Sequence, residues 1–555
     1  MREEEFDVVV VGAGAAGLTA AAVAAAEKCR VALLEATPLI GGTSAVSGGM
    51  VWMPANPKQE GDTVAMARIY LRETVPGLAN ESVREAFLAR AGEAVEYLES
   101  KTSLKFQPVP VYPDYYPNLP GATSGGRVLE ALPFDGTELG EKFALLRPPL
   151  PEFTLFGGMM ISRADIPHLR NVFRRPTSTW KVMKLLARYA RQRMTAQRGT
   201  TLYLGNALTG RLFKSVLELG VHISLGTAVE RLIEEEGRVC GVETVSHDGE
   251  RARLRAKAVI LASGGFSHDA ELRKAHLPPA AQPVSATISS GATSGARLAR
   301  AAGGRINERA ANRAFWVPAS CFVRKDGTQG VFPHTVTDRG KPGLIAVDRN
   351  GRRFVNEALS YHEFVLAMLR QPDSAVPAYL ICDSSFLWKY GLGRIKPFSL
   401  SCKADIASGY LHRAETIAEL AAKLRLPPQA LQDTIDAYNA KAEMGEDPEF
   451  GRGGDIYQRH LGDAGVRPNP CVAPIRKPPY YAVAVYPADL GTAAGLRTDA
   501  RARVLAEDDA PIPGLYACGN DMNSVMNGAY PGPGITLGPA LTFGYVAAKD
   551  AAALR

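Results

Sequence analysis

The sequence lacks the features of a membrane-spanning or disulfide-stabilised protein. It has no uninterrupted apolar run of about 18 residues, so we expect no transmembrane helix. Its first residues, MREEEF, are acidic and do not resemble a secretory signal. The seven cysteines are scattered and none forms a CxxC pair, which argues against a disulfide framework or a zinc site. We therefore expect a cytoplasmic protein that binds no metal.

Positive charge is concentrated in one short segment. Of the 555 residues, 46% are hydrophobic and 22% charged, as in globular proteins, and the length predicts two or three domains. Residues 163–198 hold ten Lys or Arg against a single acid, which exceeds the net charge of +7 of the whole chain. The remainder is therefore slightly acidic, and with no nucleic-acid motif we expect no nucleic-acid partner.

The N-terminal region carries a dinucleotide-binding motif in its full context. An apolar run at 6–11 precedes GAGAAG, an Ala-rich helical segment follows, and a second apolar run ends at Glu35. Gly12 permits the tight turn, Gly14 lets a pyrophosphate approach the backbone, and Gly17 lets the helix pack on the strand. Glu35 is placed to bind ribose hydroxyls.

Further segments indicate a larger cofactor than NAD. The loop GGTSAVSGG at 41–49 is rich in Gly, Ser and Thr, residues 227–244 predict two strands joined by a turn, and residues 256–267 predict a buried strand that runs into two glycines. Together with the fingerprint, these segments resemble the FAD-binding domain of the fumarate reductase and succinate dehydrogenase flavoproteins, which implies FAD. No second GxGxxG follows a strand, so we expect an external electron acceptor such as a quinone rather than NAD(P)H.

A Gly- and Pro-rich segment near the C-terminus leads into a helix. Within MNGAYPGPGITLGPALTFGYVAA, Tyr530 stands beside two prolines and two glycines, and an apolar helical stretch begins at about Ile535. The positive end of this helix would face the flavin pyrimidine ring. Residues 514–520 predict a strand and turn that, in the flavoproteins, return to the cofactor. The predicted cofactor-binding residues are Gly12, Gly14, Ala15, Ala16, Gly17, Glu35, Gly41, Gly42, Thr43, Ser44, Ser47, Gly48, Gly49, Val229, Ala262, Ser263, Gly264, Gly519, Asn520, Gly534, Thr536 and Leu537.

Over most of its length the chain resembles the 3-ketosteroid Δ1-dehydrogenases. The matching stretches are YPGPGITLGPALTFGYVAA, GGTSAVSGGMVWMP, VYPDYYP and GRRFVNEALSYHEF. The resemblance implies that Tyr361 abstracts a proton and that Tyr115, or alternatively Tyr116, assists it. It also implies that the Tyr530 hydroxyl and the Gly534 N–H hold the C3 carbonyl of the steroid. Residues 156–211 have no counterpart in the compact family members and resemble longer bacterial relatives.

Desaturation beside a ketone requires these residue types. Two donors must polarise the carbonyl, a base must take the C2 proton, and flavin N5 must accept hydride from C1. A phenol has a pKa of about 10, so a tyrosine base needs stabilising neighbours. We therefore expect an FAD-dependent 1,2-desaturase of 3-ketosteroids. The alternatives are a flavin enzyme for another ketone or enone, such as a Δ4-(5α)-dehydrogenase or an enone reductase, and a non-catalytic lipid-binding flavoprotein.

A fumarate reductase is not expected. NEALSYHE places Tyr361 where those enzymes carry an acid-donating arginine, and DLGTAAGL lacks their histidines. Without a cationic clamp for a dicarboxylate, the expected substrate is large, neutral and carbonyl-bearing. Phe315 and Trp316 are candidates for an apolar wall of its site, although core packing explains them equally well.

The basic segment has helical periodicity. In MKLLARYARQRM, at 183–194, apolar residues gather on one side and basic residues on another. The pattern suits a solvated helix face, and it also suits an interfacial helix resting on an anionic membrane surface; the sequence leaves both open. The apolar side comprises Met183, Leu186, Ala187, Ala190 and Met194, and the basic side Lys184, Arg188 and Arg191.

The predicted fold class is α/β: a Rossmann-like FAD-binding domain of the fumarate reductase flavoprotein type with an inserted α+β catalytic domain that caps the flavin. We expect the first part of the FAD-binding domain at 1–308, including the basic insertion at about 150–210. The catalytic domain would span 309–484 and the second FAD-binding part 485–555. Within the catalytic domain, residues 417–443 predict two helices split by a Pro-Pro pair.

Overall fold

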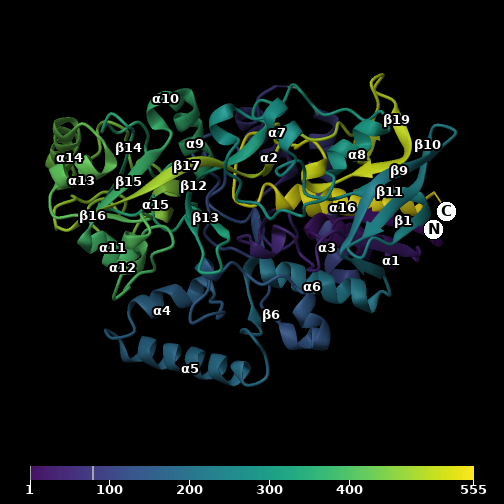
Figure 1. The fold of residues 1–555 in the computed structure, drawn as a ribbon, viewed down its shortest axis with the longest axis horizontal. Helices are drawn as coiled ribbons and strands as arrows, with labels where there is room; N and C mark the ends of the chain where they lie inside the picture. The colour runs from purple at the N-terminus through teal and green to yellow at the C-terminus, as the bar shows by residue number, and fades with distance from the viewer. Residues whose placement is uncertain (1, 78–80, 555) are drawn as a thin grey trace.

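The computed structural model of the chain describes residues 2–77 and 81–554, which form two large sheets with surrounding helices (Figure 1). The larger sheet follows the order β18–β19–β11–β1–β2–β8, and β10 and β9 extend it from β11. Its strands are β1 (Arg2–Val11), β2 (Val31–Glu35), β8 (His222–Leu225), β9 (Thr227–Glu235), β10 (Arg238–Ser246), β11 (Arg251–Leu261), β18 (Arg503–Leu505) and β19 (Pro511–Ala517).

Parallel pairing brings distant segments to one edge of this sheet. β1 pairs in parallel with β11 and β2, β2 with β8, and β11 with β19. The carboxyl ends of β1, β2, β11 and β19 therefore lie together, at Val11, Glu35, Leu261 and Ala517. All five residues of β2 are buried, as expected for a parallel strand covered on both faces. Helices α1 (Ala15–Ala26) and α16 (Leu537–Ala552) pack against each other beside this edge, so the two ends of the chain are neighbours in Figure 1.

The second sheet belongs to the middle of the chain and lies at the far end of the molecule from the termini (Figure 1). Its order is β13–β12–β17–β15–β14, and β16 also pairs with β17. A separate apolar core joins it to α13 and α14, the two helices predicted on either side of the Pro-Pro pair. The bounds are β12 (Ala314–Val323), β13 (Gln329–Pro333), β14 (Leu344–Val347), β15 (Ala378–Asp383), β16 (His412–Ala414), β17 (Tyr480–Thr492), α13 (Ile417–Leu424) and α14 (Pro428–Ala442).

Smaller elements complete the described chain. Two small sheets consist of β3 (Met50–Trp52), β5 (Val128–Ala131) and β4 (Phe106–Pro108), and of β6 (Phe134–Asp135) and β7 (Thr201–Leu202). The other helices are α2 (Val64–Thr74), α3 (Glu81–Lys101), α4 (Ile166–Arg170), α5 (Pro176–Arg193), α6 (Leu204–Glu218), α7 (Ala270–His276), α8 (Gly295–Ala301), α9 (Tyr361–Arg370), α10 (Pro372–Ala375), α11 (Ser384–Tyr390), α12 (Lys403–Ala407) and α15 (Ile456–Leu461). Short 3₁₀ turns are η1 (Ser44–Val46), η2 (Gly136–Leu145), η3 (Pro151–Phe153), η4 (Arg163–Asp165), η5 (Pro279–Ala281) and η6 (Gly519–Asp521).

The predicted elements are present with shifted ends. The C-terminal helix begins at Leu537 rather than at about Ile535, and the basic helix begins at Pro176, about two turns before the quoted pattern. The predicted domain boundary at 484 falls inside β17, so the division into domains stays a prediction. Over residues 2–77 and 81–554, no helix combines the length and the apolar character needed to cross a membrane.

Candidate active site

The fingerprint turn lies at the carboxyl end of β1, where its three glycines have different surroundings. A Cβ on Gly12 would lie 2.4 Å from the Ala262 carbonyl oxygen, and one on Gly17 would lie 1.8 Å from the Gly12 oxygen. Packing within the protein therefore requires glycine at both positions. At Gly14, the N-cap of α1, a Cβ would meet only the Ser44 hydroxyl, at 3.7 Å. This open space suits backbone that a pyrophosphate approaches.

The loop 41–49 and Glu35 border the turn. The Glu35 carboxylate accepts a hydrogen bond from the Ala13 N–H at 2.9 Å, and the Ser44 hydroxyl accepts one from the Ala15 N–H at 3.1 Å. Glu35 thus braces the turn itself, and ribose binding by Glu35 stays a prediction. The loop provides further open backbone, because a Cβ on either of two of its glycines would meet no atom nearer than 3.7 Å. Those glycines are Gly42 and Gly48.

The ends of β11 and β19 meet beside the turn and are joined by Asp521, which the sequence analysis missed. Its buried carboxylate accepts hydrogen bonds from the hydroxyl and the N–H of Ser263. A Cβ on Gly264 would meet nothing within 4 Å, whereas one on Gly519 would lie 2.9 Å from the Ala16 Cβ. No motif singled out Asp521, because a lone acid after a turn is a weak signal.

The start of α16 lies close to β3. Thr536 is the N-cap of this helix and Leu537 is its first residue. The Gly534 carbonyl accepts from the Trp52 N–H at 3.1 Å, and a Cβ on Gly534 would lie 2.5 Å from the Met50 oxygen, so glycine is required there. Within the described residues the Gly534 N–H has no hydrogen-bond acceptor. That N–H is therefore available to a ligand.

The structure brings most of the predicted cofactor residues to one edge of the larger sheet. Val229 is buried near the start of β9, which follows β8 directly and contacts β2, the strand that ends at Glu35. The residues around the fingerprint turn and the meeting strand ends are Gly12, Gly14, Ala15, Ala16, Gly17, Glu35, Gly41, Gly42, Thr43, Ser44, Ala262, Ser263, Gly264, Gly519 and Asn520. Ser47, Gly48 and Gly49 continue the loop toward β3, where Gly534, Thr536 and Leu537 lie.

Three tyrosines from distant segments meet in one buried cluster, which we call the tyrosine cluster: Tyr115, Tyr361 and Tyr530. The Tyr115 hydroxyl donates to the Tyr361 hydroxyl at 3.1 Å. The Tyr361 and Tyr530 rings lie edge to face with centroids 5.0 Å apart, and Tyr115 stacks on Tyr530 at 5.7 Å. Tyr116, the alternative helper, instead donates to Glu363 at 2.7 Å. The geometry therefore favours Tyr115 as the partner of Tyr361.

Burial and mutual contacts set the pKa values in the tyrosine cluster. Burial raises the pKa of Tyr361 well above its ordinary value, Tyr530 raises it further, and the hydrogen bond from Tyr115 lowers it. Burial raises the pKa of Tyr530 to about 12, and a hydrogen bond with Tyr361 opposes this shift. The donor Tyr115 is therefore the cluster member that favours ionisation of Tyr361.

The tyrosine-bearing loops are tied to each other by backbone contacts. The Tyr115 N–H donates to the Pro531 carbonyl at 2.9 Å, and the Tyr70 hydroxyl donates to the same oxygen at 2.6 Å. Beside them the buried Asp114 carboxylate accepts from Arg127 at 2.7 Å. The sequence analysis predicted none of Tyr70, Asp114 and Arg127, because nothing local in the sequence links them to residue 531.

The side chains in ring contact with the tyrosine cluster are uncharged. Phe315 lies edge to face with Tyr530 at 5.5 Å, which agrees with the apolar wall predicted from the sequence. Trp316 is buried, and its backbone N–H donates to Nδ1 of His362 at 3.1 Å. Burial lowers the pKa of His362 to about 3, so its ring is neutral and carries its proton on Nε2. This Nε2 has no hydrogen-bond partner in the described part of the chain.

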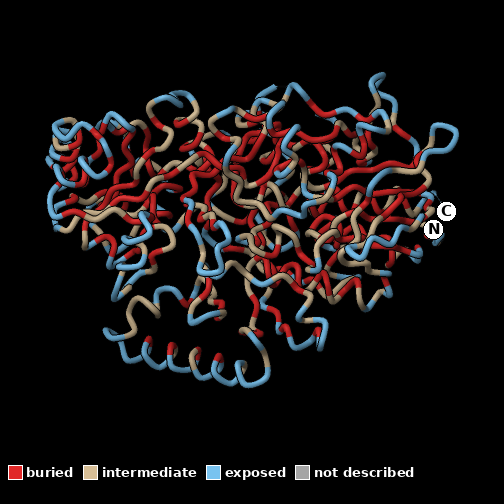
Figure 2. The backbone as a smooth tube through the Cα atoms, viewed as in Figure 1, coloured by how far each residue is buried: buried red, intermediate tan, exposed pale blue. Residues whose placement is uncertain are grey.

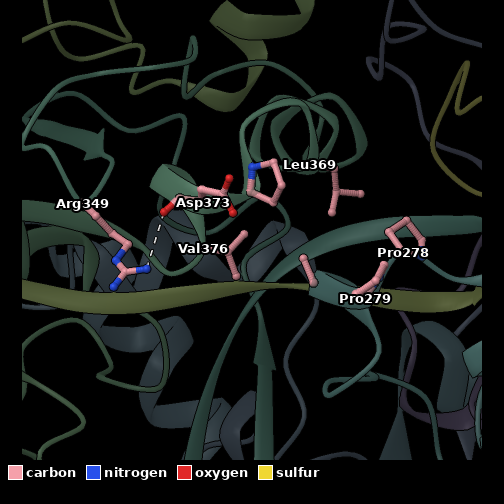
Figure 3. A pocket seen from close by; sticks show the side chains of 8 residues that line it. Pro278, Pro279, Arg349, Leu369, Asp373 and Val376 are labelled. Carbon is pink, nitrogen blue, oxygen red and sulfur yellow. Dashed lines mark hydrogen bonds between the residues drawn. The ribbon is translucent and has the colours of Figure 1, made fainter.

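A separate cavity of about 670 Å³ lies between η5 and the end of α9 (Figure 3). Arg349 closes one side by donating to the Asp373 carbonyl at 3.5 Å. None of the predicted site residues lines this cavity, so it is distinct from the tyrosine cluster. Its lining consists of Pro278, Pro279, Ala280, Arg349, Leu369, Pro372, Asp373 and Val376.

Helices α4 and α5 project from the body of the molecule, and their outward surface is largely exposed (Figures 1 and 2). The predicted helix is confirmed, but its buried side is not the predicted apolar one. Val182, Leu185 and Tyr189 face the protein. Met183, Ala187, Ala190 and Met194 are instead exposed together with Lys184, Arg188 and Arg191. We call these exposed residues, with Phe173 and Trp180, the basic face; Phe173 is 96% exposed and Trp180 65%.

Comparisons with known proteins agree with this geometry. A family model described as "FAD binding domain" matches residues 7–537. The chain is 38% identical to a 4-oxocyclohex-2-ene-1-carboxylate 5-dehydrogenase of Sinomonas cyclohexanicum, over 99% of this chain and 94% of that protein. It is 36% identical to a 3-oxosteroid 1-dehydrogenase of Mycobacterium tuberculosis, over 99% and 98% of the two chains. The crystal structure of 3-ketosteroid delta1-dehydrogenase from Sterolibacterium denitrificans, in complex with 1,4-androstadiene-3,17-dione, superposes with a TM-score of 0.92 at 38% identity and covers all of both chains.

These similarities confirm the predicted fold class, and FAD is the cofactor that the open glycine positions fit. The glycines at 14, 42, 48 and 264 face space that the protein does not fill, as an extended dinucleotide requires. The chain therefore belongs to the FAD binding domain family, and among its full-length relatives are the 3-oxosteroid 1-dehydrogenases.

Proposed function

We propose that this chain introduces a C1=C2 double bond into a 3-ketosteroid. The observation that carries the proposal is the meeting of Tyr115, Tyr361 and Tyr530 near Gly534, because this set supplies one base and two carbonyl donors. FAD, when bound along the fingerprint edge, supplies the hydride acceptor. An external electron acceptor, such as a quinone, completes the turnover.

Each member of the set has one role in this proposal. The Tyr530 hydroxyl and the Gly534 N–H donate to the C3 carbonyl oxygen and stabilise the negative charge that develops on it. The C2 proton passes to the phenolate oxygen of Tyr361, and the C1 hydrogen leaves as hydride. The electron pair of the broken C2–H bond forms the second bond between C1 and C2. Tyr115 donates to Tyr361 and so favours its ionised form.

A keto acid with a single ring is the second candidate substrate, because the Sinomonas relative is named for one. The neighbours of the tyrosine cluster argue for a neutral ligand instead. The rings that contact its members are Phe315, Tyr457 and the uncharged His362, none of which attracts a carboxylate. A neutral steroid therefore fits this wall better than a carboxylate.

Anaerobic mixing of the holoenzyme with each ketone decides between these substrates. We expect androstenedione to bleach the flavin and 4-oxocyclohex-2-ene-1-carboxylate to leave it oxidised. NMR of the product then separates 1,2- from 4,5-desaturation. Bleaching by the keto acid alone would replace the steroid with the second candidate, and no bleaching by either would leave the non-catalytic alternative.

Substitutions in the tyrosine cluster test the base. Tyr361→Phe should stop flavin bleaching and exchange of the C2 hydrogen with deuterated solvent, while ligand binding persists because the ring still packs. Activity of the wild type should rise with pH, since only the ionised phenol accepts a proton and burial raises its pKa. Tyr115→Phe should move this rise to higher pH. Tyr116→Phe is the matched control, because its hydroxyl bonds Glu363 and not Tyr361; a larger loss there than in Tyr115→Phe would exchange the two roles.

We also propose that the basic face rests on an anionic membrane surface. Its exposed apolar side chains lie in a segment with an excess of positive charge, whereas the rest of the chain has none. This combination suits a helix lying in the plane of a lipid interface. A hydrophobic substrate that partitions into a bilayer would then reach the enzyme from that surface.

A further inference from the structure

Arg339 is a fully buried cation that bonds only to backbone carbonyls. It lies between β13 and β14 with no exposed surface. Its guanidinium donates to the oxygens of His334 at 2.8 Å, Thr335 at 3.0 Å, Glu357 at 2.9 Å and Leu359 at 3.2 Å. Among the described residues, no carboxylate accepts a hydrogen bond from this guanidinium. Its charge is therefore not neutralised by direct pairing.

Other buried arginines of the chain are paired differently. Four of them donate to at least one carboxylate, which offsets the cost of burying the charge, whereas the buried Arg84 has no carboxylate among its hydrogen-bond partners in the described residues. Arg339 has only a shared counter-ion in its sequence neighbour Asp338, whose carboxylate accepts from His334 at 2.6 Å and from two backbone N–H groups. The paired arginines are Arg127 with Asp62 and Asp114, Arg273 with Asp489, Arg353 with Glu357 and Asp447, and Arg452 with Glu357.

Two of the carbonyls that accept from Arg339, those of Glu357 and Leu359, belong to the segment just before Tyr361. Leu359 precedes Ser360, the N-cap of α9, and Tyr361 is the first residue of that helix. Side chains at a helix start point back toward the N-terminus, where the helix dipole is positive. The guanidinium also lies over the Phe364 ring, 5.1 Å from its centroid, one turn along the same helix. Arg339 therefore contacts both the backbone before Tyr361 and the helix after it.

The titratable groups around this unit include phenols and two carboxylates, Asp338 and Glu357, whose pKa values are lowered by their cationic neighbours. Burial lowers the pKa of Arg339, while Tyr457, Asp338, Tyr115 and Tyr361 raise it, which places the guanidinium within electrostatic range of the phenols. By the same coupling, Arg339 lowers the pKa of Tyr457 against the larger effect of burial. The groups that face Tyr361 or Arg339 are Tyr112, Tyr115, Tyr457, Tyr530, His334, Asp338, Glu357, His362 and Glu363.

We propose that Arg339 is a positioning residue for the base: it holds the backbone that starts α9 and places a buried positive charge that favours the ionised phenol of Tyr361. This inference rests on the proposed role of Tyr361. A cation beside a phenolate stabilises the charged form, whereas burial alone favours the neutral one. Arg339 and the donor Tyr115 therefore both favour the ionised form of Tyr361, Arg339 through its charge and Tyr115 through its hydrogen bond.

The test compares Arg339→Gln and Arg339→Lys with the wild-type holoenzyme. Ultraviolet titration of the tyrosines, taken as the difference between each protein and its Tyr361→Phe counterpart, reports ionisation of Tyr361 without any turnover. We expect Arg339→Gln to raise the midpoint by about one pH unit, which is a loss of about tenfold in the ionised fraction below it. The pH profile of flavin reduction should shift by the same amount with flavin content retained.

Arg339→Lys separates charge from positioning. The ammonium keeps the charge but cannot bond the Glu357 and Leu359 carbonyls as a fork does. We expect its midpoint to stay near the wild-type value while the rate of flavin reduction falls, and this variant carries the test if Arg339→Gln does not fold. Arg273→Gln is the control, because Arg273 is buried but paired with Asp489 and bonds none of the carbonyls that Arg339 holds, so the Tyr361 midpoint should not move.

Two results would overturn the proposal: an unchanged Tyr361 midpoint in Arg339→Gln, or a wild-type rate of flavin reduction in Arg339→Lys. An equal midpoint shift in Arg273→Gln would also overturn it, since the effect would then be general to the buried arginines. Failure of every ketone to bleach the wild-type flavin would count against the proposed function, and the titration midpoints would still decide the role of Arg339.

Discussion

Tyr361 and Tyr530 are neighbouring buried phenols, yet their surroundings assign them opposite tasks. Tyr361 accepts a hydrogen bond from Tyr115 and begins a helix, and both features favour negative charge on its oxygen. Burial raises the pKa of Tyr530 to about 12, so this phenol keeps its proton at neutral pH and remains a donor. Burial also raises the pKa of Tyr361 well above its ordinary value, so the proposed base role of Tyr361 rests on the hydrogen bond from Tyr115 and on its place at the helix start.

Removal of the Tyr530 hydroxyl tests this division. Tyr530→Phe loses one of two donors to the developing enolate, and turnover should fall on the order of 10²–10³. The ring contacts with Phe315 and Tyr115 persist, so flavin content and fold should be unchanged. Steady-state kinetics with androstenedione provide the measurement. Turnover close to that of the wild type would remove Tyr530 from the mechanism.

At the scale of elements, β1, its turn and α1 form a unit with two kinds of glycine. Some are required for folding, and one is predicted to be required for cofactor binding. Gly12 and Gly17 are required because a side chain at either would collide with backbone oxygens. Gly14 has room for a side chain in the protein alone. The spacing of the fingerprint thus combines two physical demands in six residues, close packing and ligand access.

Gly14→Val should leave the apoprotein folded and abolish retention of FAD, because the added side chain enters the space of the pyrophosphate. Gly17→Val should destabilise the fold itself, since its Cβ would lie 1.8 Å from a backbone oxygen. Circular dichroism and thermal unfolding report the fold, and the flavin absorbance of purified protein reports the cofactor. A yellow Gly14→Val protein, or loss of fold in both variants alike, contradicts this assignment.

At the scale of the whole molecule, the two large sheets lie at opposite ends and the tyrosine cluster draws on both. Tyr530 follows β19 of the larger sheet, whereas Tyr361 starts a helix that contacts β12 of the second. We propose that the domains follow these sheets, with the middle of the chain as a cap over the cofactor edge. The cluster would then be complete only when the two parts are together.

Liposome binding can test whether the basic face contacts an anionic membrane. The holoenzyme should co-sediment with anionic liposomes at low salt and be released at high salt, because screening weakens the attraction. Combined replacement of Lys184, Arg188 and Arg191 by glutamine should abolish binding. The control removes the same charge from Arg231, Arg251 and Arg253, which pair with glutamates on another surface, and should still bind. Equal binding to neutral liposomes, or none to either kind, would refute the proposed membrane contact.

Local physics explains what the sequence alone determined. The fingerprint, the paired helices around Pro427 and Pro428, and the Tyr-Pro-Gly segment before α16 depend on residues within one turn or one strand of each other. Glycine permits backbone conformations that other residues avoid and proline fixes φ, so these features can be predicted from the sequence alone. The resemblance at the three tyrosine segments likewise indicated which phenols to consider.

Only the tertiary structure decided how those phenols are placed and charged. Tyr115 and Tyr361 are 246 residues apart, and neither segment encodes that one donates to the other. Asp521, His362 and Arg339 were missed for the same reason, since their partners lie on other elements. The outward direction of the basic face was also decided by packing: α5 buries Val182, Leu185 and Tyr189, and a helical pattern alone does not specify which of two adjacent apolar strips meets the protein.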